Sequence, residues 1–172
     1  MTLPLRLPPG RYHLESVAND KDGEAASARR IALVVPAAGA APRVALSDLV
    51  LVRNVQPAGE DRDATNPLEF SGGKVTPELN STIAKSSGAV DGVYFVLYPV
   101  QGASPDVRIA ISRNGGLVTS VRPDLPPAEA DGSIRIVARI PFGSLEPGAY
   151  EISVTAQQGG ATTRRIMAVE VQ

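Results

Sequence analysis

The stretch Leu145-Glu146-Pro147-Gly148-Ala149-Tyr150 decides the fold of this chain, and its pattern occurs a second time at Leu7-Pro8-Pro9-Gly10-Arg11-Tyr12. Proline fixes φ and glycine admits positive φ, so each Pro-Gly pair predicts a sharp bend. The tyrosine that follows begins a run of alternating apolar and polar residues, and its hydroxyl is expected to hydrogen-bond back to the bend. The predicted corner residues are Leu7, Pro9, Gly10, Tyr12, Leu145, Pro147, Gly148 and Tyr150.

This arrangement resembles the tyrosine corner of immunoglobulin-like and fibronectin type III sandwiches, in which the tyrosine opens the penultimate strand. The rest of the chain agrees with that resemblance. Short alternating runs are separated by glycine- and proline-containing turns, and no stretch shows a helical period for more than a turn or two. We therefore predict an all-β fold, an immunoglobulin-like antiparallel β-sandwich.

The repeated corner also predicts how the chain is divided. Tyr12 and Leu14 occupy the positions of Tyr150 and Ile152 in the second copy. We interpret residues 44–172 as a complete sandwich. Residues 1–36 then form the last two strands, a hairpin, of a second, truncated sandwich. Residues 37–43 are mostly small and include a proline, which is typical of a linker.

A hairpin on its own is only marginally stable in water. Residues 1–36 are therefore expected to pack on the complete sandwich, to pair with another chain, or to open and close. Packing on the neighbouring domain is the favoured alternative, because exposed apolar strands tend to be covered. The partner predicted for this chain is accordingly protein, either a neighbouring domain or another chain.

The most apolar strand is predicted at residues 93–100. Val93, Phe95 and Leu97 point to one face, while Tyr94, Val96 and Tyr98 point to the other. Two alternatives remain for the second set. Tyr94, Val96 and Tyr98 form an exposed interaction surface, or neighbouring elements cover them; the second is favoured because broad exposed apolar patches are uncommon.

The sequence patterns between residues 56 and 83 are weaker. Residues 56–73 read as a long polar loop. Residues 74–77 predict a short edge strand, because Pro77 lacks the N–H that a central strand needs. The segment around Ile83 has no assignable pattern.

Composition excludes several classes of function. The formal net charge is −1 and no basic cluster is present, so nucleic acid is not an expected partner. The chain contains no cysteine, which excludes disulfides and thiolate chemistry. No apolar run approaches the roughly 20 residues of a membrane-spanning helix, and membrane insertion is not expected. The first residues lack the pattern of a signal peptide.

Two acidic clusters are candidate calcium ligands. Asp20, Asp22 and Glu24 lie in the predicted hairpin turn, and Glu60, Asp61 and Asp63 lie in the long polar loop. The first cluster only partly matches a calcium loop and lacks the distal bidentate glutamate. Solvated turn and loop residues are the favoured interpretation of both clusters, and no cofactor is predicted.

Catalytic residues are not predicted either. His13 is the one histidine, and it lies on a strand with no serine or cysteine partner pattern nearby. Residues 71–74, Ser-Gly-Gly-Lys, do not form a phosphate-binding loop, because the upstream glycine is missing and valine follows the lysine. We expect a protein that is not an enzyme.

Several motifs together resemble a family. Its motifs here are Leu46-Ser47-Asp48-Leu49-Val50-Leu51, Asn66-Pro67-Leu68-Glu69-Phe70, Val75-Thr76-Pro77, Val93-Tyr94-Phe95-Val96-Leu97-Tyr98-Pro99 and the Pro-Gly-x-Tyr corner. They resemble the C-terminal β-sandwich region of bacterial von Willebrand factor type A-related proteins of the acidobacterial type. The resemblance implies an exported protein, periplasmic or extracellular. The type A domain itself and its Asp-x-Ser-x-Ser metal motif do not occur in this chain.

Two functions follow as hypotheses. The first is a non-catalytic structural or interaction module of a larger exported bacterial protein. The second is a module that binds protein, carbohydrate or calcium through the 56–73 loop or the Tyr94–Tyr98 strand face.

Overall fold

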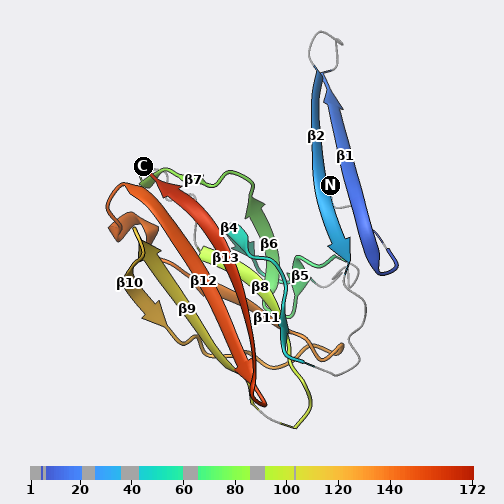
Figure 1. The fold of residues 1–172 in the computed structure, drawn as a ribbon, viewed down its shortest axis with the longest axis vertical. Coiled ribbons are helices and arrows are strands. Elements are labelled where there is room, and N and C mark those ends of the chain that lie inside the picture. The colour runs from blue at the N-terminus through green and yellow to red at the C-terminus, as the bar shows by residue number, and fades with distance from the viewer. Residues whose placement is uncertain are drawn as a thin grey trace. The chain divides into compact units, whose positions relative to one another are not determined.

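The structure is a computed structural model, and it describes residues 5, 7–20, 26–35, 43–59, 66–85, 92–102 and 104–172. The chain divides into two compact units, Met1–Pro42 and Arg43–Gln172. Strands make up most of the described residues of both units (Figure 1).

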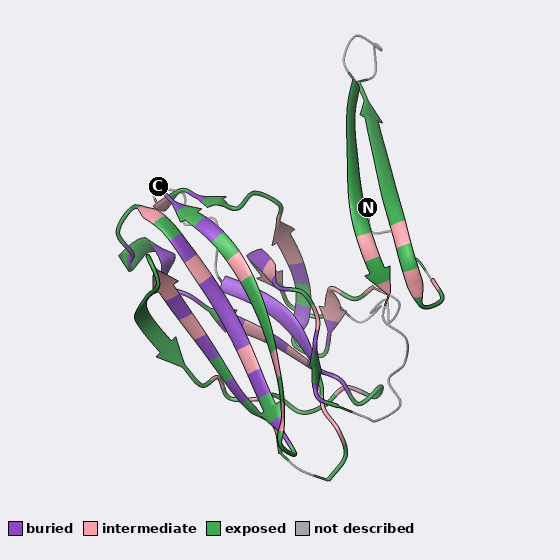
Figure 2. Cartoon of the chain, viewed as in Figure 1, coloured by how far each residue is buried: buried purple, intermediate pink, exposed green. Residues whose placement is uncertain are grey.

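The first unit is an antiparallel hairpin of β1 (Gly10–Asn19) and β2 (Ala26–Val35). The register runs without a shift from the pair Gly10–Val35 to the pair Asn19–Ala26. Because side chains alternate along a strand, Tyr12, Leu14 and their opposite residues share one face of this hairpin. Most residues of both strands are exposed, as Figure 2 shows.

The second unit is a sandwich of two sheets. In the described part of the chain, one sheet has five strands in the order β10-β9-β12-β13-β7, and the other has six. The strands of the five-stranded sheet are β7 (Thr82–Ile83), β9 (Asp106–Arg113), β10 (Gly116–Val121), β12 (Gly148–Gln158) and β13 (Ala161–Val171). The strands of the six-stranded sheet are β3 (Ala45–Leu46), β4 (Val50–Gln56), β5 (Glu69–Phe70), β6 (Gly73–Glu78), β8 (Gly92–Tyr98) and β11 (Ile134–Arg139). The predicted all-β sandwich is confirmed.

Alternating apolar side chains from both sheets fill the space between them. Phe95 and Leu97 of β8 face Ile109 of β9 and Ile152 of β12 in one cluster, and all four are at most 1% exposed. The predicted inward set of β8 therefore lies in the main core. The strand β8 is interior to its sheet, between β11 and β4, as its apolar character on both faces indicates.

Both predicted corners form. The Tyr12 hydroxyl donates to the Pro8 carbonyl oxygen and the Tyr150 hydroxyl donates to the Glu146 carbonyl oxygen, each at 2.8 Å. The two copies differ in their glycines. Gly148 has φ 143°, a value that favours glycine, whereas Gly10 has no positive φ.

Arg113 of β9 holds the second corner in place. Its Nη1 lies 2.9 Å from Glu146 Oε2, and its Nη2 donates to the Pro147 carbonyl oxygen at 2.9 Å. The guanidinium carbon lies 5.5 Å from the centre of the Tyr150 ring, within the range of a cation–π contact. The corner is thereby tied to the neighbouring strand as well as to its own backbone.

Substituting Tyr150 by phenylalanine tests this corner. Tyr150 is only 5% exposed, so the change removes a hydrogen bond whose donor is buried. We expect the free energy of unfolding to fall by about 1 kcal/mol, the usual contribution of such a hydrogen bond. Tyr12→Phe is the matched control, because Tyr12 is more exposed and its loss should cost less. Equal effects in chemical denaturation would contradict the assignment of Tyr150 as the buried corner.

Three features depart from the sequence-based expectations. The 56–73 segment is not wholly a loop, because β5 pairs with β6 at Glu69–Lys74 and Phe70–Gly73. The strand β6 lies between β4 and β5 and is not a free edge, although β5 reaches only its first two residues, so Pro77 still lies at an open edge. Finally, one strand pair is parallel rather than antiparallel: β7 joins β13 through Ile83 and its neighbour, and Ile83 is buried at 2% exposure.

Hydrogen bonds extend this parallel pair to both sides. Glu170 N donates to the Ser81 carbonyl oxygen, Gln172 N donates to that of Ile83, and Lys85 N donates to that of Gln172. The distances are 2.9, 2.9 and 2.8 Å. Residues 81–85 are therefore fixed by residues 170–172.

Candidate functional site

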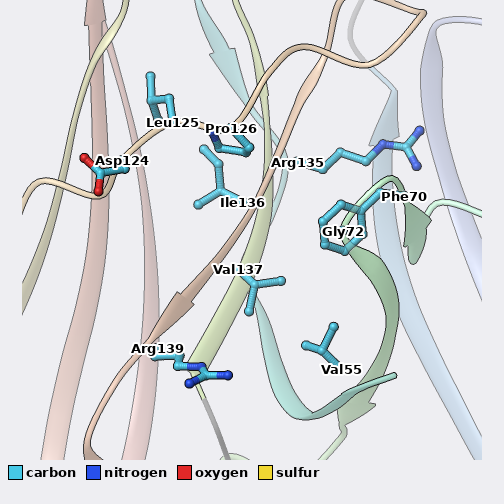
Figure 3. A pocket seen from close by; sticks show the side chains of 10 residues that line it. All are labelled: Val55, Phe70, Gly72, Asp124, Leu125, Pro126, Arg135, Ile136, Val137 and Arg139. Carbon is cyan, nitrogen blue, oxygen red and sulfur yellow. The ribbon is translucent and has the colours of Figure 1, made fainter. Parts of the chain in front are cut away.

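The candidate site is a pocket of about 440 Å³ beside β11 (Figure 3). Its apolar walls come from three parts of the sequence: Val55 of β4, Phe70 of β5, and Leu125 in the segment between β10 and β11. Arg135 and Arg139 of β11 supply the cationic groups. Asp124 adds a carboxylate to the lining. The pocket thus combines apolar surface with two guanidinium groups and one carboxylate, and a ligand with an apolar body and an anionic end suits its cationic side.

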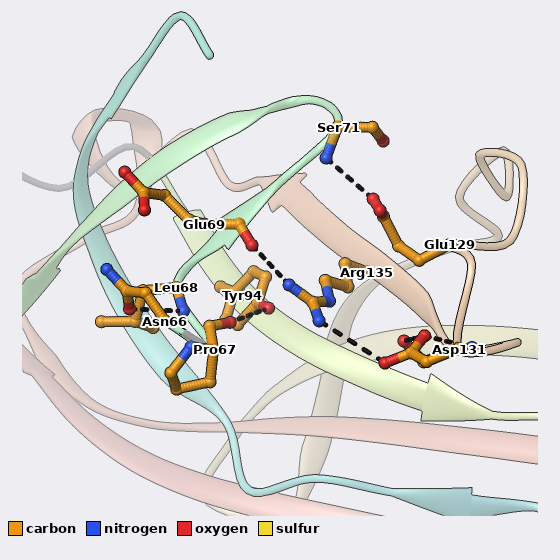
Figure 4. A network of polar contacts seen from close by, with 10 residues as sticks. Asn66, Pro67, Leu68, Glu69, Ser71, Tyr94, Glu129, Asp131 and Arg135 are labelled. Carbon is orange, nitrogen blue, oxygen red and sulfur yellow. Dashed lines mark hydrogen bonds and ion pairs between the residues drawn. The ribbon is translucent and has the colours of Figure 1, made fainter. Parts of the chain in front are cut away.

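The guanidinium group of Arg135 makes two contacts within the fold (Figure 4). Its Nη1 donates to the Glu69 carbonyl oxygen of β5, and its Nη2 lies 3.6 Å from Asp131 Oδ2. Its side chain is only 14% exposed. Arg135 therefore links β5 to the loop before β11, and it is not available as the main anion-binding group.

The loop before β11 is fixed by its own polar contacts. Asp131 Oδ1 accepts hydrogen bonds from Ser133 Oγ at 2.6 Å and from Ser133 N at 2.9 Å, and these bonds lower the pKa of Asp131. Glu129 Oε1 accepts a hydrogen bond from Ser71 N at 2.8 Å. Glu129 therefore ties the segment 66–72, which contributes Phe70 and Gly72 to the pocket, to the loop before β11 (Figure 4).

Arg139 is the cation that the network leaves available. Its residue is exposed, and none of the contacts found among the described residues gives it an ionic partner. It lies opposite Gly92 at the end of the β8–β11 ladder. Figure 3 shows its guanidinium group apart from that of Arg135, with Val137 between the two residues along the strand.

Beneath the pocket, a second apolar cluster covers the outer side of β8. Tyr94 and Val96 pack there with Val52, Phe70 and Val75. The rings of Phe70 and Tyr94 lie 5.9 Å apart, and the Tyr94 hydroxyl donates to the Pro67 carbonyl oxygen at 2.7 Å. This cluster explains why residues 66–70 leave the predicted loop and fold over the sheet.

The predicted interaction surface of Tyr94, Val96 and Tyr98 is therefore not a continuous exposed strip. Tyr94 and Val96 are 3% and 7% exposed, and only Tyr98 is half exposed. Tyr94 and Val96 thus follow the favoured alternative, in which neighbouring elements cover the strand. The physical reason is Phe70. Burial of its ring holds the otherwise polar segment 66–70 over Tyr94 and Val96.

Of the predicted acidic ligands, the structure describes Asp20 alone. Asp20 lies at the end of β1 and is exposed. Asp22, Glu24, Glu60, Asp61 and Asp63 lie outside the described residues. Within the described ranges, no three histidine, aspartate or glutamate side chains are grouped as a metal ion requires. His13 is exposed on β1, opposite Ala32.

Sequence reasoning missed Arg139 as a candidate binding residue. The available signal was the alternation Arg135-Val137-Arg139 on the outward face of β11, between the core residues Ile134, Ile136 and Ala138. Such alternation is common on solvated strands. Only the position of Phe70 and Leu125 beside the arginines distinguishes this face from any other.

The buried hydroxyl of Tyr94 predicts a measurable dependence of stability on alkaline pH. Burial raises the pKa of Tyr94 from 10.0 to about 12. The folded state thus holds its proton more tightly than the unfolded state does. The resulting stability is complete below pH 10 and is lost as pH rises toward 12, by roughly 2 kcal/mol.

Tyr94→Phe isolates this contribution. The variant should be less stable at neutral pH by about 1 kcal/mol or more, because the Pro67 carbonyl loses its donor. It should also lose the corresponding part of the decline between pH 10 and 12. Urea denaturation at several pH values measures both effects. Parallel pH profiles of the two proteins would show that Tyr94 ionises normally.

Comparison with protein-family models and with curated protein sequences finds no match for this chain. The described residues contain no helix that is long and apolar enough to span a membrane. Functional interpretation therefore depends on the geometry described above.

Proposed function

We propose that this chain is a non-catalytic structural and interaction module of a larger exported bacterial protein, built from immunoglobulin-like units in tandem. The observation that carries the proposal is the corner hydrogen bond, which has the same form and the same length of 2.8 Å in both copies. A hairpin that begins with the same corner as β12 and β13 is the expected end of a second unit of the same kind.

Exposure of the first hairpin supports this interpretation. Ile152 in the second unit is fully buried, whereas Leu14 at the matching position of the first hairpin is 40% exposed. Ile31, opposite Leu14, is 43% exposed. In the proposed arrangement, this face is the inner face of a sandwich whose other sheet is supplied by further sequence.

The sequence encoded upstream of Met1 tests the proposal. We expect an export signal, a von Willebrand type A domain and strands that complete the first sandwich. Amide hydrogen exchange of the extended protein should then protect β1 and β2 as strongly as β12 and β13. Upstream sequence without strand patterns, or no gain of protection, would contradict the tandem arrangement. Upstream sequence without an export signal would contradict the predicted periplasmic or extracellular location.

Ligand binding is a second candidate, and the pocket beside β11 specifically favours it. Arg139 offers a charged end and Phe70 an apolar wall, so short aromatic and aliphatic carboxylates are suitable probes. A binding site would give saturable NMR shifts near Val137 that disappear in Arg139→Ala and persist in Arg108→Ala, an exposed arginine of β9. Shifts that grow linearly in all three proteins would exclude a specific site.

Calcium binding is tested separately, because most of its predicted ligands lie outside the described residues. The structural-module proposal predicts the same melting temperature in calcium and in a chelator. A rise in melting temperature with calcium would favour the binding module instead.

A further inference from the structure

The turn between β9 and β10 contains the dipeptide Asn114-Gly115. Both residues are exposed, with φ values of 52° and 77°, the positive values that a two-residue hairpin turn requires. Asparagine is a thermolabile residue, because the backbone nitrogen of the next residue can attack its side-chain carbonyl carbon. A glycine in that next position carries no Cβ atom to hinder the attack. The turn therefore places a chemically reactive dipeptide on the surface.

Neither reacting group is held by other contacts. Among the described residues, the Asn114 side chain takes part in no hydrogen bond or ion pair. Gly115 lies outside the β9–β10 ladder, which begins at the pair Gly116–Arg113, and its N–H makes none of the turn hydrogen bonds of the described chain. A Cβ atom added at Gly115 would meet nothing within 4 Å. The peptide between Asn114 and Gly115 thus has room to rotate into the geometry that the attack needs.

Asp131-Gly132 shows the opposite arrangement on a similar backbone. Gly132 also has a positive φ, 79°, and an added Cβ atom there would also meet nothing within 4 Å. The Asp131 carboxylate, however, accepts hydrogen bonds from Ser133 N and Oγ and pairs with Arg135. A carboxylate is in addition a poorer electrophile than an amide. The feature that distinguishes Asn114 is therefore an unrestrained amide side chain before a glycine.

The other asparagines are less favourable for this reaction. Each is followed by a residue with a side chain: Asn19, Asn54, Asn66 and Asn80. Asn54 is also held within β4, opposite Thr76 of β6. Asn66 precedes a proline, which has no N–H to deprotonate, and its Oδ1 accepts a hydrogen bond from Leu68 N. Sequence and structure thus agree on Asn114.

We propose that Asn114 is a site of spontaneous deamidation, which converts the β9–β10 turn to isoaspartate. The deprotonated Gly115 nitrogen attacks Asn114 Cγ, the new N–Cγ bond closes a succinimide ring, and the side-chain nitrogen takes up a proton and leaves as ammonia. Water then opens the ring. Cleavage of the new N–Cγ bond gives aspartate, whereas cleavage of the original backbone C–N bond gives isoaspartate. No electrons are transferred, and water is the one co-reactant.

Isoaspartate routes the main chain through the side chain and so lengthens it by one methylene group. Two-residue turns fit strand pairing only with particular backbone angles, so this insertion disrupts the register that begins at the pair Gly116–Arg113. β10 pairs with β9 alone, and all of its residues are exposed, so little else holds it (Figure 2). The modification therefore releases β10 and leaves the β9–β12 pairing in place. This inference is independent of the tandem arrangement and of the pocket beside β11.

Ageing the full chain at mildly alkaline pH, folded and in urea, tests the proposal. Peptide mass spectrometry follows asparagine, aspartate and isoaspartate at each position until Asn114 has reacted in urea. In that time Asn114 should also be lost from the folded chain, with release of ammonia, whereas Asn54 should be lost only in urea. Amide hydrogen exchange of the aged folded protein should show loss of protection in β10 and unchanged protection in β12.

Two variants separate the possible causes of a change in β10. Asn114→Gly removes the electrophile and keeps a residue that adopts positive φ, so its β10 should stay protected during ageing. Asn114→Asp is the matched control for charge, because it adds the same carboxylate without lengthening the main chain. Freshly prepared, it should protect β10 as the unaged protein does.

Three results would overturn the proposal. The first is an Asn114 that reacts in urea but persists in the folded chain. The second is aspartate as the sole product. The third is a β10 strand that keeps its full protection after deamidation, or that loses it equally in fresh Asn114→Asp protein, since charge alone would then explain the change.

Discussion

Gly92→Ala is expected to destabilise the second unit by roughly 3 kcal/mol or more, the largest effect of any substitution considered for this chain. Gly92 begins β8 and is buried against the end of β11. A Cβ atom at this position would lie 2.0 Å from the Ala138 carbonyl oxygen and 2.9 Å from the Arg139 Cα. Both atoms belong to the backbone of the paired strand, so no side-chain rotation relieves the clash and the two strands must separate.

Chemical denaturation measures this effect, and Gly143→Ala is the control. Gly143 lies in the 3₁₀ turn η2 (Phe142–Ser144), where an added Cβ meets no atom within 4 Å and φ is not positive. We expect the control to change the free energy of unfolding by no more than about 0.5 kcal/mol. A Gly92→Ala protein as stable as the control would mean that β8 and β11 do not approach as closely as described.

Ile152→Ala is expected to cost about 3 kcal/mol, whereas Leu14→Ala should cost less than about 1 kcal/mol. The two residues occupy the same position after the two corners, but Ile152 is fully buried and Leu14 is 40% exposed. The loss at Ile152 combines reduced burial of apolar surface with the cavity left between the sheets. Little of either term applies to Leu14.

Comparing Ile152→Ala with Leu14→Ala also tests whether other strands cover the Leu14 face of the first hairpin. In a chain extended by the proposed upstream strands, Leu14→Ala should approach the cost of Ile152→Ala, because both residues would then lie between two sheets. Thermal and urea denaturation of both variants in both chains provide the four values. A large cost of Leu14→Ala in the present chain would show that something already covers this face.

The corners and the main core could be predicted because their signals are local. Proline, glycine and tyrosine at fixed spacing define a bend, and Phe95 and Leu97 alternate with the residues of the opposite face. The hairpin of β1 and β2 could be predicted from its two alternating runs, although its register was not among the sequence-based expectations. In each case the pattern lies within a few neighbouring residues, so distant parts of the chain are not needed to predict the element.

Ile83 and Phe70 show where local patterns are insufficient. Ile83 pairs with β13 across much of the chain, in a two-residue strand that no periodicity marks. Phe70 is a single apolar residue in a polar segment, and its burial depends on Tyr94 and the sheet beneath it. The pocket beside β11 could not be predicted for the same reason. Its walls come from distant segments, and its arginines resemble ordinary surface residues.

The hydrogen bonds between residues 81–85 and residues 170–172 also constrain the order of events during synthesis. The earlier segment leaves the ribosome while its partners have yet to be translated. Until residues 170–172 clear the exit tunnel, Ile83 has no strand to join and the five-stranded sheet lacks its edge strand β7. The second unit therefore completes its folding only after nearly all of its sequence has emerged, and a chaperone would meet it with β7 still undocked.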